Sequence, residues 1–296
     1  MKFTNCEICY HNNWVSIYNG KIRDGIFGNY ITGEVKKCNK CKAQRLAEKN
    51  CLNISSYQNS EYREKLSKGI DVSSFFMEQD IQTLFTLNTL WPRSVRDKTV
   101  MDIGAGAGSL LDSLKGMTKA QLVIEPYKNY HQSLIKRGYN VFSCINDAID
   151  TWLDKIDVAF AIQVIEHTLN PRVFLEEIKP FLKKNGILII STPNTDDILL
   201  DILPDDYPSF FYRVVHRWYF NSLSLAFCAE ASGFKVEQIV PLHRYSMSNM
   251  MNWLKNKKPM GNNEISGIDK SADDLWKTYL EKNVKSDCLY LILSKQ

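Results

Sequence analysis

The sequence predicts an α/β protein with a seven-stranded, doubly wound sheet, a small four-cysteine module at the N-terminus and an insertion near the C-terminus. Three observations support this fold class. Short apolar runs alternate with helical stretches from residue 96 onward, which is typical of parallel strands joined by crossover helices. Two Cys-x-x-Cys pairs stand near the start of the chain. A long polar and aromatic stretch separates the last two predicted strands.

The first predicted module spans residues 1–54 and contains the pairs Cys6/Cys9 and Cys38/Cys41. Two such pairs supply the four thiolates of a closed tetrahedral zinc site, and a closed site has a structural role. The residues between the pairs alternate apolar and polar with glycine turns, which predicts a hairpin. A redox-active pair and four unrelated cysteines are the alternatives.

Residues 55–95 carry apolar residues at helical spacing and are predicted to form a helical connector. The main domain, residues 96–240, alternates strands with helices, and residues 241–296 hold the insertion and the final strand. The predicted strands are "TVMDIG", "QLVIEP", "NVFSC", "DVAFAI", "ILIIST", "FKVEQIV" and "CLYLILS". Ligands of such sheets bind at the carboxyl ends of the strands.

The loop after the first of these strands reads Asp102-x-Gly104-x-Gly106-x-Gly108. It lacks the Lys-Ser or Lys-Thr of a phosphate-binding P-loop, and its glycines are out of frame with the dinucleotide fingerprint. Asp102 would repel a pyrophosphate, because like charges at short range are costly. Glu125 ends the second strand, where an acid can accept hydrogen bonds from ribose hydroxyls. The pattern predicts a nucleoside with a positively charged tail, such as S-adenosylmethionine (SAM).

Four segments resemble, in this order and spacing, the class I SAM-dependent methyltransferases, which have a Rossmann-like fold: "VMDIGAGAGSLL", "LVIEP", "DVAFAIQVIEHTLNP" and "LIISTPN". The resemblance implies that Gly104 and Gly106 cradle the methionine tail and that Glu125 binds the ribose. It also implies that Asp147 lies near the adenine and that Gln163 lines the pocket. For Asp147, an exposed acid at a helix start is an alternative that stays open.

The layout as a whole resembles a narrower group, the zinc-bearing methyltransferases of sugar and surface-polysaccharide biosynthesis. The cysteine pairs, the segment "HRWYFN" and the insertion carry this resemblance. Some members methylate carbon in deoxysugar nucleotides and have a Glu-His pair where this chain has Val215-His216. The missing glutamate favours O-methylation of a sugar, sugar nucleotide or related small acceptor, with C-methylation as the alternative. The insertion suits a cap over an acceptor pocket.

Methyl transfer requires an aligned acceptor and, for a hydroxyl, removal of its proton. His216 and His167 are the candidate bases, and His216 is preferred because the segment around it is rich in aromatic residues. The alternative for each is a hydrogen bond to a neighbouring backbone group. Arg217, Arg244 and Tyr245 are candidate contacts to an acceptor phosphate or hydroxyl, although such residues are also common on surfaces.

Other classes of function are weighed by charge and composition. Lysines near the second cysteine pair favour a second hypothesis, an RNA methyltransferase that grips RNA with its zinc module. A SAM-binding scaffold without activity is the third. A net charge of +4 is too small to argue for nucleic acid or a membrane. The chain shows neither a membrane-spanning run nor a secretory signal. The sequence thus predicts a soluble, cytoplasmic enzyme that acts on a small molecule, without nucleic-acid binding or membrane insertion.

Overall fold

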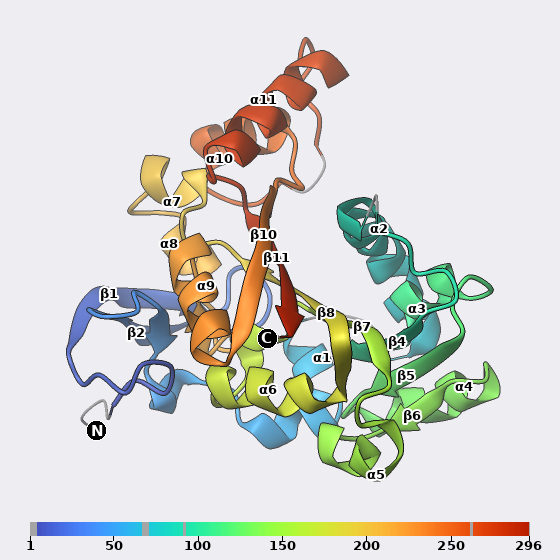
Figure 1. Cartoon of the computed structure of the whole chain (residues 1–296). Helices are drawn as coiled ribbons and strands as arrows, with labels where there is room; N and C mark the ends of the chain where they lie inside the picture. Colours follow the sequence, from blue (N-terminus) through green and yellow to red (C-terminus); the bar gives the residue numbers. More distant parts are fainter. Residues whose placement is uncertain (1–4, 67–70, 91–92, 261–262, 296) are drawn as a thin grey trace.

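The computed structural model describes residues 5–66, 71–90, 93–260 and 263–295. They form a seven-stranded sheet in the order β10-β11-β8-β7-β4-β5-β6 and a four-stranded sheet in the order β1-β2-β3-β9. The strand order of the large sheet reverses between β4 and β7, as in a doubly wound sheet. The predicted fold class is therefore confirmed. Figure 1 shows the small sheet and the β6 edge of the large sheet on opposite sides of the molecule.

The large sheet gathers the carboxyl ends of most of its strands at one edge. Its strands are β4 (Thr99–Ile103), β5 (Ala120–Ile124), β6 (Asn140–Phe142), β7 (Ile156–Ile162), β8 (Leu182–Pro193), β10 (Phe234–Leu242) and β11 (Cys288–Lys295). Strands β4 to β8 pair in parallel, whereas β11 is antiparallel to both β8 and β10. Strand β10 therefore runs in the same direction as β8, and the chain that follows it starts at the same edge as the loop after β4.

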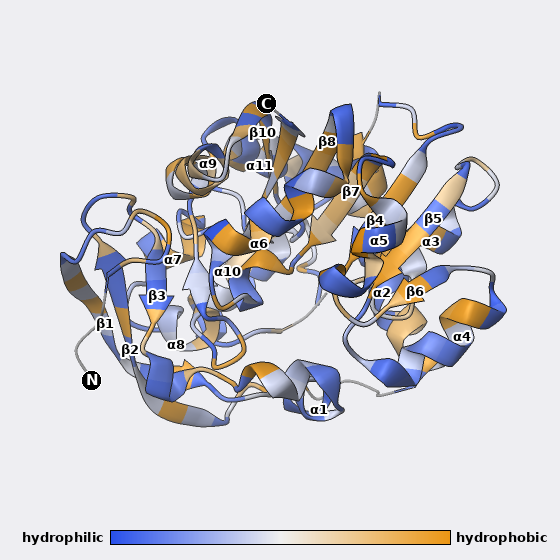
Figure 2. Ribbon diagram, turned by 60° about the horizontal axis from the view of Figure 1, so that its bottom comes forward, coloured by the Kyte–Doolittle hydropathy of each residue, from blue (hydrophilic) through white to orange (hydrophobic). Residues whose placement is uncertain are grey.

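Helices cover both faces of this sheet, because its central strands are apolar on both sides. On one face lie α2 (Val72–Leu90), α3 (Ser109–Leu114) and α4 (His131–Lys136). On the other lie α5 (Ile149–Trp152), α6 (Pro171–Ile178) and α9 (Ser222–Ala231). Figure 2 shows apolar residues along β4 and β5 and a mixture of polar and apolar residues on the outer helix α4. The short helix α1 (Glu61–Lys65) precedes α2.

The small sheet joins the N-terminal module to the main domain. It contains β1 (Trp14–Arg23), β2 (Tyr30–Cys38), β3 (Gln44–Leu46) and β9 (Trp218–Tyr219). Strands β1 and β2 form the predicted hairpin, and β9, from the main domain, pairs antiparallel with β3. Trp218 and three of the four clustered cysteines, Cys6, Cys38 and Cys41, belong to one buried apolar cluster. The module thus shares a core with the main domain.

The C-terminal insertion leaves β10 and returns as β11, with α10 (Met247–Asn256) and α11 (Lys270–Lys282) between them. Trp253 of α10 packs its ring 5.0 Å from those of Tyr207 and Phe210. Tyr207 directly precedes α8 (Pro208–Phe211) and Phe210 lies within it; α8 follows α7 (Ile198–Ile202). The insertion therefore leans on the segment between β8 and β9. In the parts of the chain that the structure describes, no helix is both long and apolar enough to cross a bilayer.

Candidate active site

The glycine loop lies at the carboxyl end of β4, and its backbone and its neighbours both require glycine. Gly104 and Gly106 have φ angles of +71° and +56°, in the left-handed region that side chains disfavour. A Cβ atom on Gly104 would lie 2.6 Å from Val164, and one on Gly106 would lie 2.2 Å from the ring of Phe75. Phe75, on α2, thus lies directly over the loop.

Two buried carboxyl groups flank this loop. Glu125 accepts hydrogen bonds from the backbone N–H groups of Gly106 at 2.6 Å and Tyr127 at 2.8 Å. Burial nevertheless raises the pKa of Glu125 to about 7. Burial and then the charge of Glu125 raise the pKa of Asp102 to about 8. A cation bound beside these two carboxyls would relieve their repulsion, so the loop fits the sulfonium and ammonium groups of SAM.

The other two predicted SAM contacts, Gln163 and Asp147, form hydrogen bonds with neighbouring groups of the protein. Gln163, at the end of β7, directs its amide nitrogen to the hydroxyl of Ser191 at 3.2 Å and the sulfur of Cys288 at 3.4 Å. Asp147 is exposed, and its carboxylate accepts a hydrogen bond from the backbone of Cys144 at 3.3 Å. This arrangement corresponds to the helix-start role, and the adenine contact stays a prediction.

The two candidate bases lie against each other. The rings of His167, just after β7, and His216, just before β9, have centroids 4.8 Å apart. Nδ1 of His167 donates to the carbonyl oxygen of Val215 at 2.6 Å, which leaves the lone pair on Nε2. Burial lowers the pKa of His167 to about 4 and that of His216 well below its usual value, and nearby Arg213 lowers both further. Both imidazoles are therefore neutral at pH 7, the form that accepts a proton.

Sequence analysis missed a buried acid beside this pair, although it stands next to His167 in the chain. Glu166 is fully buried, and neither of its carboxyl oxygens has a hydrogen-bond partner among the described residues; the same holds for Nδ1 of His216. Burial raises the pKa of Glu166 to about 7. Glu166, His167 and His216 offer ligand atoms within 4.8 Å of one another, as a metal site would. The guanidinium of Arg213 nearby opposes a metal cation there.

The glycine loop and the histidine pair adjoin. Val164, which packs on Gly104, lies three residues before His167 in the chain. The ring of Tyr62, on α1, lies 5.5 Å from that of His167. Burial raises the pKa of Tyr62 to about 12, and the charges of Glu166 and Glu125 add smaller contributions in the same direction.

Each of the three predicted acceptor contacts interacts with a neighbouring side chain. Arg217 pairs with Glu48 of the N-terminal module. Arg244 contacts Asp287 at 2.6 and 2.7 Å, which ties the two ends of the insertion together. Tyr245 is partly exposed and lies beneath the guanidinium of Arg244, 5.7 Å from ring centroid to carbon. A role for these residues in binding an acceptor stays a prediction.

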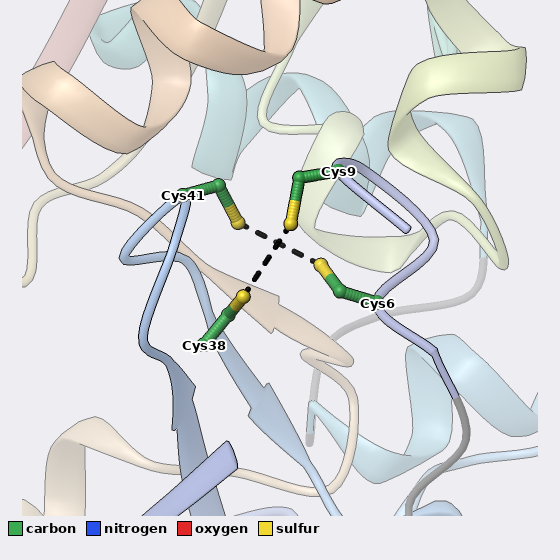
Figure 3. A group of neighbouring side chains, drawn as sticks. All are labelled: Cys6, Cys9, Cys38 and Cys41. Carbon is green, nitrogen blue, oxygen red and sulfur yellow. Dashed lines mark hydrogen bonds between the residues drawn. The ribbon is translucent and has the colours of Figure 1, made fainter. Parts of the chain in front are cut away.

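The structure brings the four predicted metal ligands together. Figure 3 shows the side chains of Cys6, Cys9, Cys38 and Cys41 directed toward a common centre. The sulfur of Cys6 lies 3.6 Å from that of Cys41, and the sulfur of Cys9 lies 3.5 Å from that of Cys38. Tetrahedral zinc with bonds of about 2.3 Å places its sulfur ligands about 3.8 Å apart. The cluster therefore fits a four-thiolate metal site.

Comparison with known proteins gives the family. A family model described as a methyltransferase domain matches residues 76–239, more than half of the chain. The chain belongs to the methyltransferase domain family. The match begins in α2 and ends in β10, so it contains the glycine loop and both histidines.

Curated relatives match over part of their length. The chain is 27% identical over 161 residues to a ubiquinone biosynthesis O-methyltransferase of Glaesserella parasuis, covering 48% of this chain and 66% of the relative. It is 24% identical over 173 residues to the mitochondrial enzyme of that name from Homo sapiens, covering 53% of this chain and 47% of the relative. The chain thus spans between about half and two thirds of the length of these relatives.

Solved structures support the fold of the methyltransferase domain. A SAM-dependent methyltransferase from Archaeoglobus fulgidus superposes with a TM-score of 0.51 at 16% identity, covering 75% of this chain and 99% of the other. One from Thermotoga maritima has a TM-score of 0.50 at 18% identity, covering 76% and 94%.

Proposed function

We propose that the protein is a SAM-dependent methyltransferase that methylates an oxygen of a small acceptor held at His167 and His216. The observation that carries this proposal is a pair of neutral histidines, His216 buried and His167 half-buried, beside a glycine loop flanked by two buried carboxyls. The names of the curated relatives support transfer to oxygen. Glu125 would contact the ribose, and Gly104 and Gly106 the methionine tail.

For methyl transfer the protein must align the acceptor oxygen with the methyl group of SAM and supply one proton acceptor. SAM supplies a methyl group that its sulfonium already activates. The acceptor oxygen bonds to the methyl carbon as the carbon–sulfur bond breaks, which leaves S-adenosylhomocysteine, and the hydroxyl proton passes to His216. The hydrogen bond from His167 to the carbonyl of Val215 fixes the ring of His167. In this position His167 would orient the acceptor. Half-buried Tyr57 donates to the same carbonyl at 2.7 Å.

For the acceptor class we favour a sugar, a sugar nucleotide or a related small molecule of polysaccharide biosynthesis. The zinc-type cysteine cluster ahead of the domain and the insertion after β10 support this assignment. Transfer to carbon is the alternative for the same site. We further propose that Cys6, Cys9, Cys38 and Cys41 bind a structural zinc ion, because four thiolates leave no open coordination position.

The test is transfer of label from methyl-labelled SAM into a cell extract separated into small anionic metabolites and total RNA. We expect label in the metabolite fraction, and its loss with His216→Ala. The Arg172→Gln variant serves as the control, because Arg172 pairs with Glu176 on α6, away from the histidines. Label in RNA would replace the small acceptor by RNA, and no label in either fraction would favour a SAM-binding scaffold.

A further inference from the structure

Two arginines from distant parts of the chain lie side by side next to the histidine pair. Arg23 ends β1, and a parallel bridge pairs it with Arg213. The bridge consists of the hydrogen bonds from Arg23 N to Tyr212 O at 2.9 Å and from Val214 N to Arg23 O at 3.0 Å. Partners in such a bridge project their side chains on the same side of the sheet, so two positive charges share one face.

Neither guanidinium has an anionic partner. Within residues 5–66, 71–90, 93–260 and 263–295, no ion pair or hydrogen bond engages the side chain of either arginine, and Nε of Arg23 is fully buried without a partner. The carboxylates along the chain nearby are engaged elsewhere: Asp24 pairs with Lys65, and Asp206 with Lys257. Burial and the charge of Arg213 together lower the pKa of Arg23 to about 9. Like charges on adjacent strands destabilise a sheet, so the free protein carries an uncompensated cost here.

Aromatic packing holds this costly arrangement in place. The guanidinium of Arg23 lies 4.1 Å from the ring centroid of Phe210, a cation–π contact. Phe210 in turn packs against Trp253 of α10, 5.0 Å between centroids. The N-terminal module, the β8–β9 segment and the insertion thus all fix the position of one arginine.

The pair also adjoins the proposed methyl acceptor. His216 donates its backbone N–H to the carbonyl of Arg213 at 3.1 Å, so the two residues share one turn. We infer that Arg23 and Arg213 form an anion-binding site that holds a phosphoryl group of the acceptor while its hydroxyl meets His216. This inference rests on the proposed function only in so far as the bound anion belongs to the methyl acceptor. The anion site itself stands on the bridge, the missing partners and the aromatic packing.

Charge balance favours a phosphoryl group over a carboxylate. Two guanidinium groups require about two negative charges, which a phosphate monoester or a diphosphate supplies and a single carboxylate does not. Planar guanidinium groups also bind phosphate oxygens through paired N–H donors. Buried Glu166 is the acid beside Arg213, and its raised pKa of about 7 leaves it partly neutral. A sugar phosphate or a sugar linked to a nucleoside diphosphate meets these requirements.

The test is calorimetric titration of pyrophosphate into the full-length, zinc-loaded protein without SAM. Arg23→Gln and Arg213→Gln are expected to weaken binding at least tenfold each, and Arg172→Gln to leave it unchanged. Pyrophosphate should raise the Tm of the wild type and not that of the two variants. In the absence of ligand, Arg23→Gln should melt no lower than the wild type, because it removes an unpaired buried charge. Retained SAM binding checks that the variants are folded.

Each other outcome overturns a stated part of the inference. Equal pyrophosphate binding by all four proteins removes the site. Tighter binding of succinate than of pyrophosphate replaces the phosphoryl group by a carboxylate. Single-stranded RNA that binds in the wild type and is lost in both site variants replaces the small acceptor by RNA. Because no titration involves methyl transfer, an inactive protein that binds pyrophosphate through the arginines would refute the proposed function and leave the anion site standing.

Discussion

The two halves of the active site carry opposite, unbalanced charge. On the side of the glycine loop, Asp102 and Glu125 are buried together and repel each other. On the side of the histidines, Arg23 and Arg213 share one face of a sheet without carboxylate partners in the described chain. The first half is complementary to a cation and the second to an anion. Each ligand would therefore supply the charge that the protein itself omits, and the free protein is less stable for lacking it.

Disruption of the cysteine cluster should have the largest effect, and it should act on the half that contains the arginines and histidines while leaving the glycine loop intact. Cys38 ends β2, the partner of the strand that carries Arg23. We expect Cys38→Ser to remove the bound zinc, abolish pyrophosphate binding and turnover, and lower the Tm, because metal binding contributes to folding. SAM binding should persist within about threefold, because the glycine loop lies on the large sheet. Zinc content by mass spectrometry and calorimetry provide the measurements.

The matched control for this variant is Cys144→Ser, because Cys144 is exposed and lies outside the cluster. It should retain zinc, turnover and Tm. If Cys38→Ser kept a full complement of zinc, the four-thiolate assignment would fail. If it lost SAM binding and pyrophosphate binding in parallel, the two halves would not be separable.

Removal of the proposed base should affect chemistry and leave both halves charged as before. His216→Ala is expected to lower kcat by about 10²- to 10⁴-fold, the usual contribution of a general base. The Kd values for SAM and pyrophosphate should change little, because a neutral imidazole holds neither ligand by charge. Single-turnover kinetics with saturating SAM would measure the effect. Intact turnover in His216→Ala together with lost turnover in His167→Ala would transfer the role of base to His167.

Sequence reasoning located the acidic half well and the basic half poorly, and the reason is physical. Asp102, Gly104 and Glu125 lie at the ends of adjacent parallel strands, so a local pattern of strand and loop brings them together. The four cysteines were found for a similar reason, since two short Cys-x-x-Cys pairs predict a shared metal site. His167 was found from its place just after the predicted strand "DVAFAI", and His216 from the aromatic residues around it and its place in the resembling family; the structure places the two rings in contact.

Sequence analysis did not identify Arg23 and Arg213, because their pairing depends on tertiary structure. Arg23 and Arg213 are separated by most of the chain, and an isolated β-bridge between the end of β1 and the segment before β9 brings them together. Arg217 and Arg244 stand in more suggestive sequence segments, yet each has a carboxylate partner, Glu48 and Asp287. Sequence shows which arginines exist, whereas the missing counter-charge is visible only once every carboxylate has been placed.

The role of the acidic half in SAM binding can be tested by replacing one of its carboxyls with an amide. Asp102→Asn should weaken SAM binding about tenfold, because the carboxyl, which its raised pKa of about 8 keeps protonated in the free protein at neutral pH, can ionise beside a bound cation and an amide cannot. The same change should stabilise the free protein above about pH 8, where the buried carboxyl of Asp102 loses its proton. Asp150→Asn, at an exposed position of α5, should do neither. A loss of stability in Asp102→Asn without a loss of SAM affinity would contradict the comparison.

The smallest expected effect is a slope of stability with pH, and its sign separates the carboxyls from the histidines. The pKa of Asp102 is raised from 3.8 to about 8 and that of Glu125 from 4.5 to about 7, so the folded protein holds more protons than the unfolded chain in this range. Their contribution is complete below about pH 4 and is lost as the pH rises to about 8. The lowered pKa of His167, about 4, contributes above pH 6.5 and is lost only toward acid.

Between pH 6.5 and 8.5 the carboxyls therefore dominate, and the free energy of unfolding of the free protein should fall. Asp102 alone accounts for roughly 1 to 2 kcal/mol of this decrease by proton linkage. Urea unfolding across this range should show a shallower slope for Asp102→Asn than for the wild type. Some slope should remain, because burial also raises the pKa values of Glu166 and Asp197 to about 7. An identical slope in both proteins would contradict a titration of Asp102 between pH 6.5 and 8.5, and with it the raised pKa of this carboxyl.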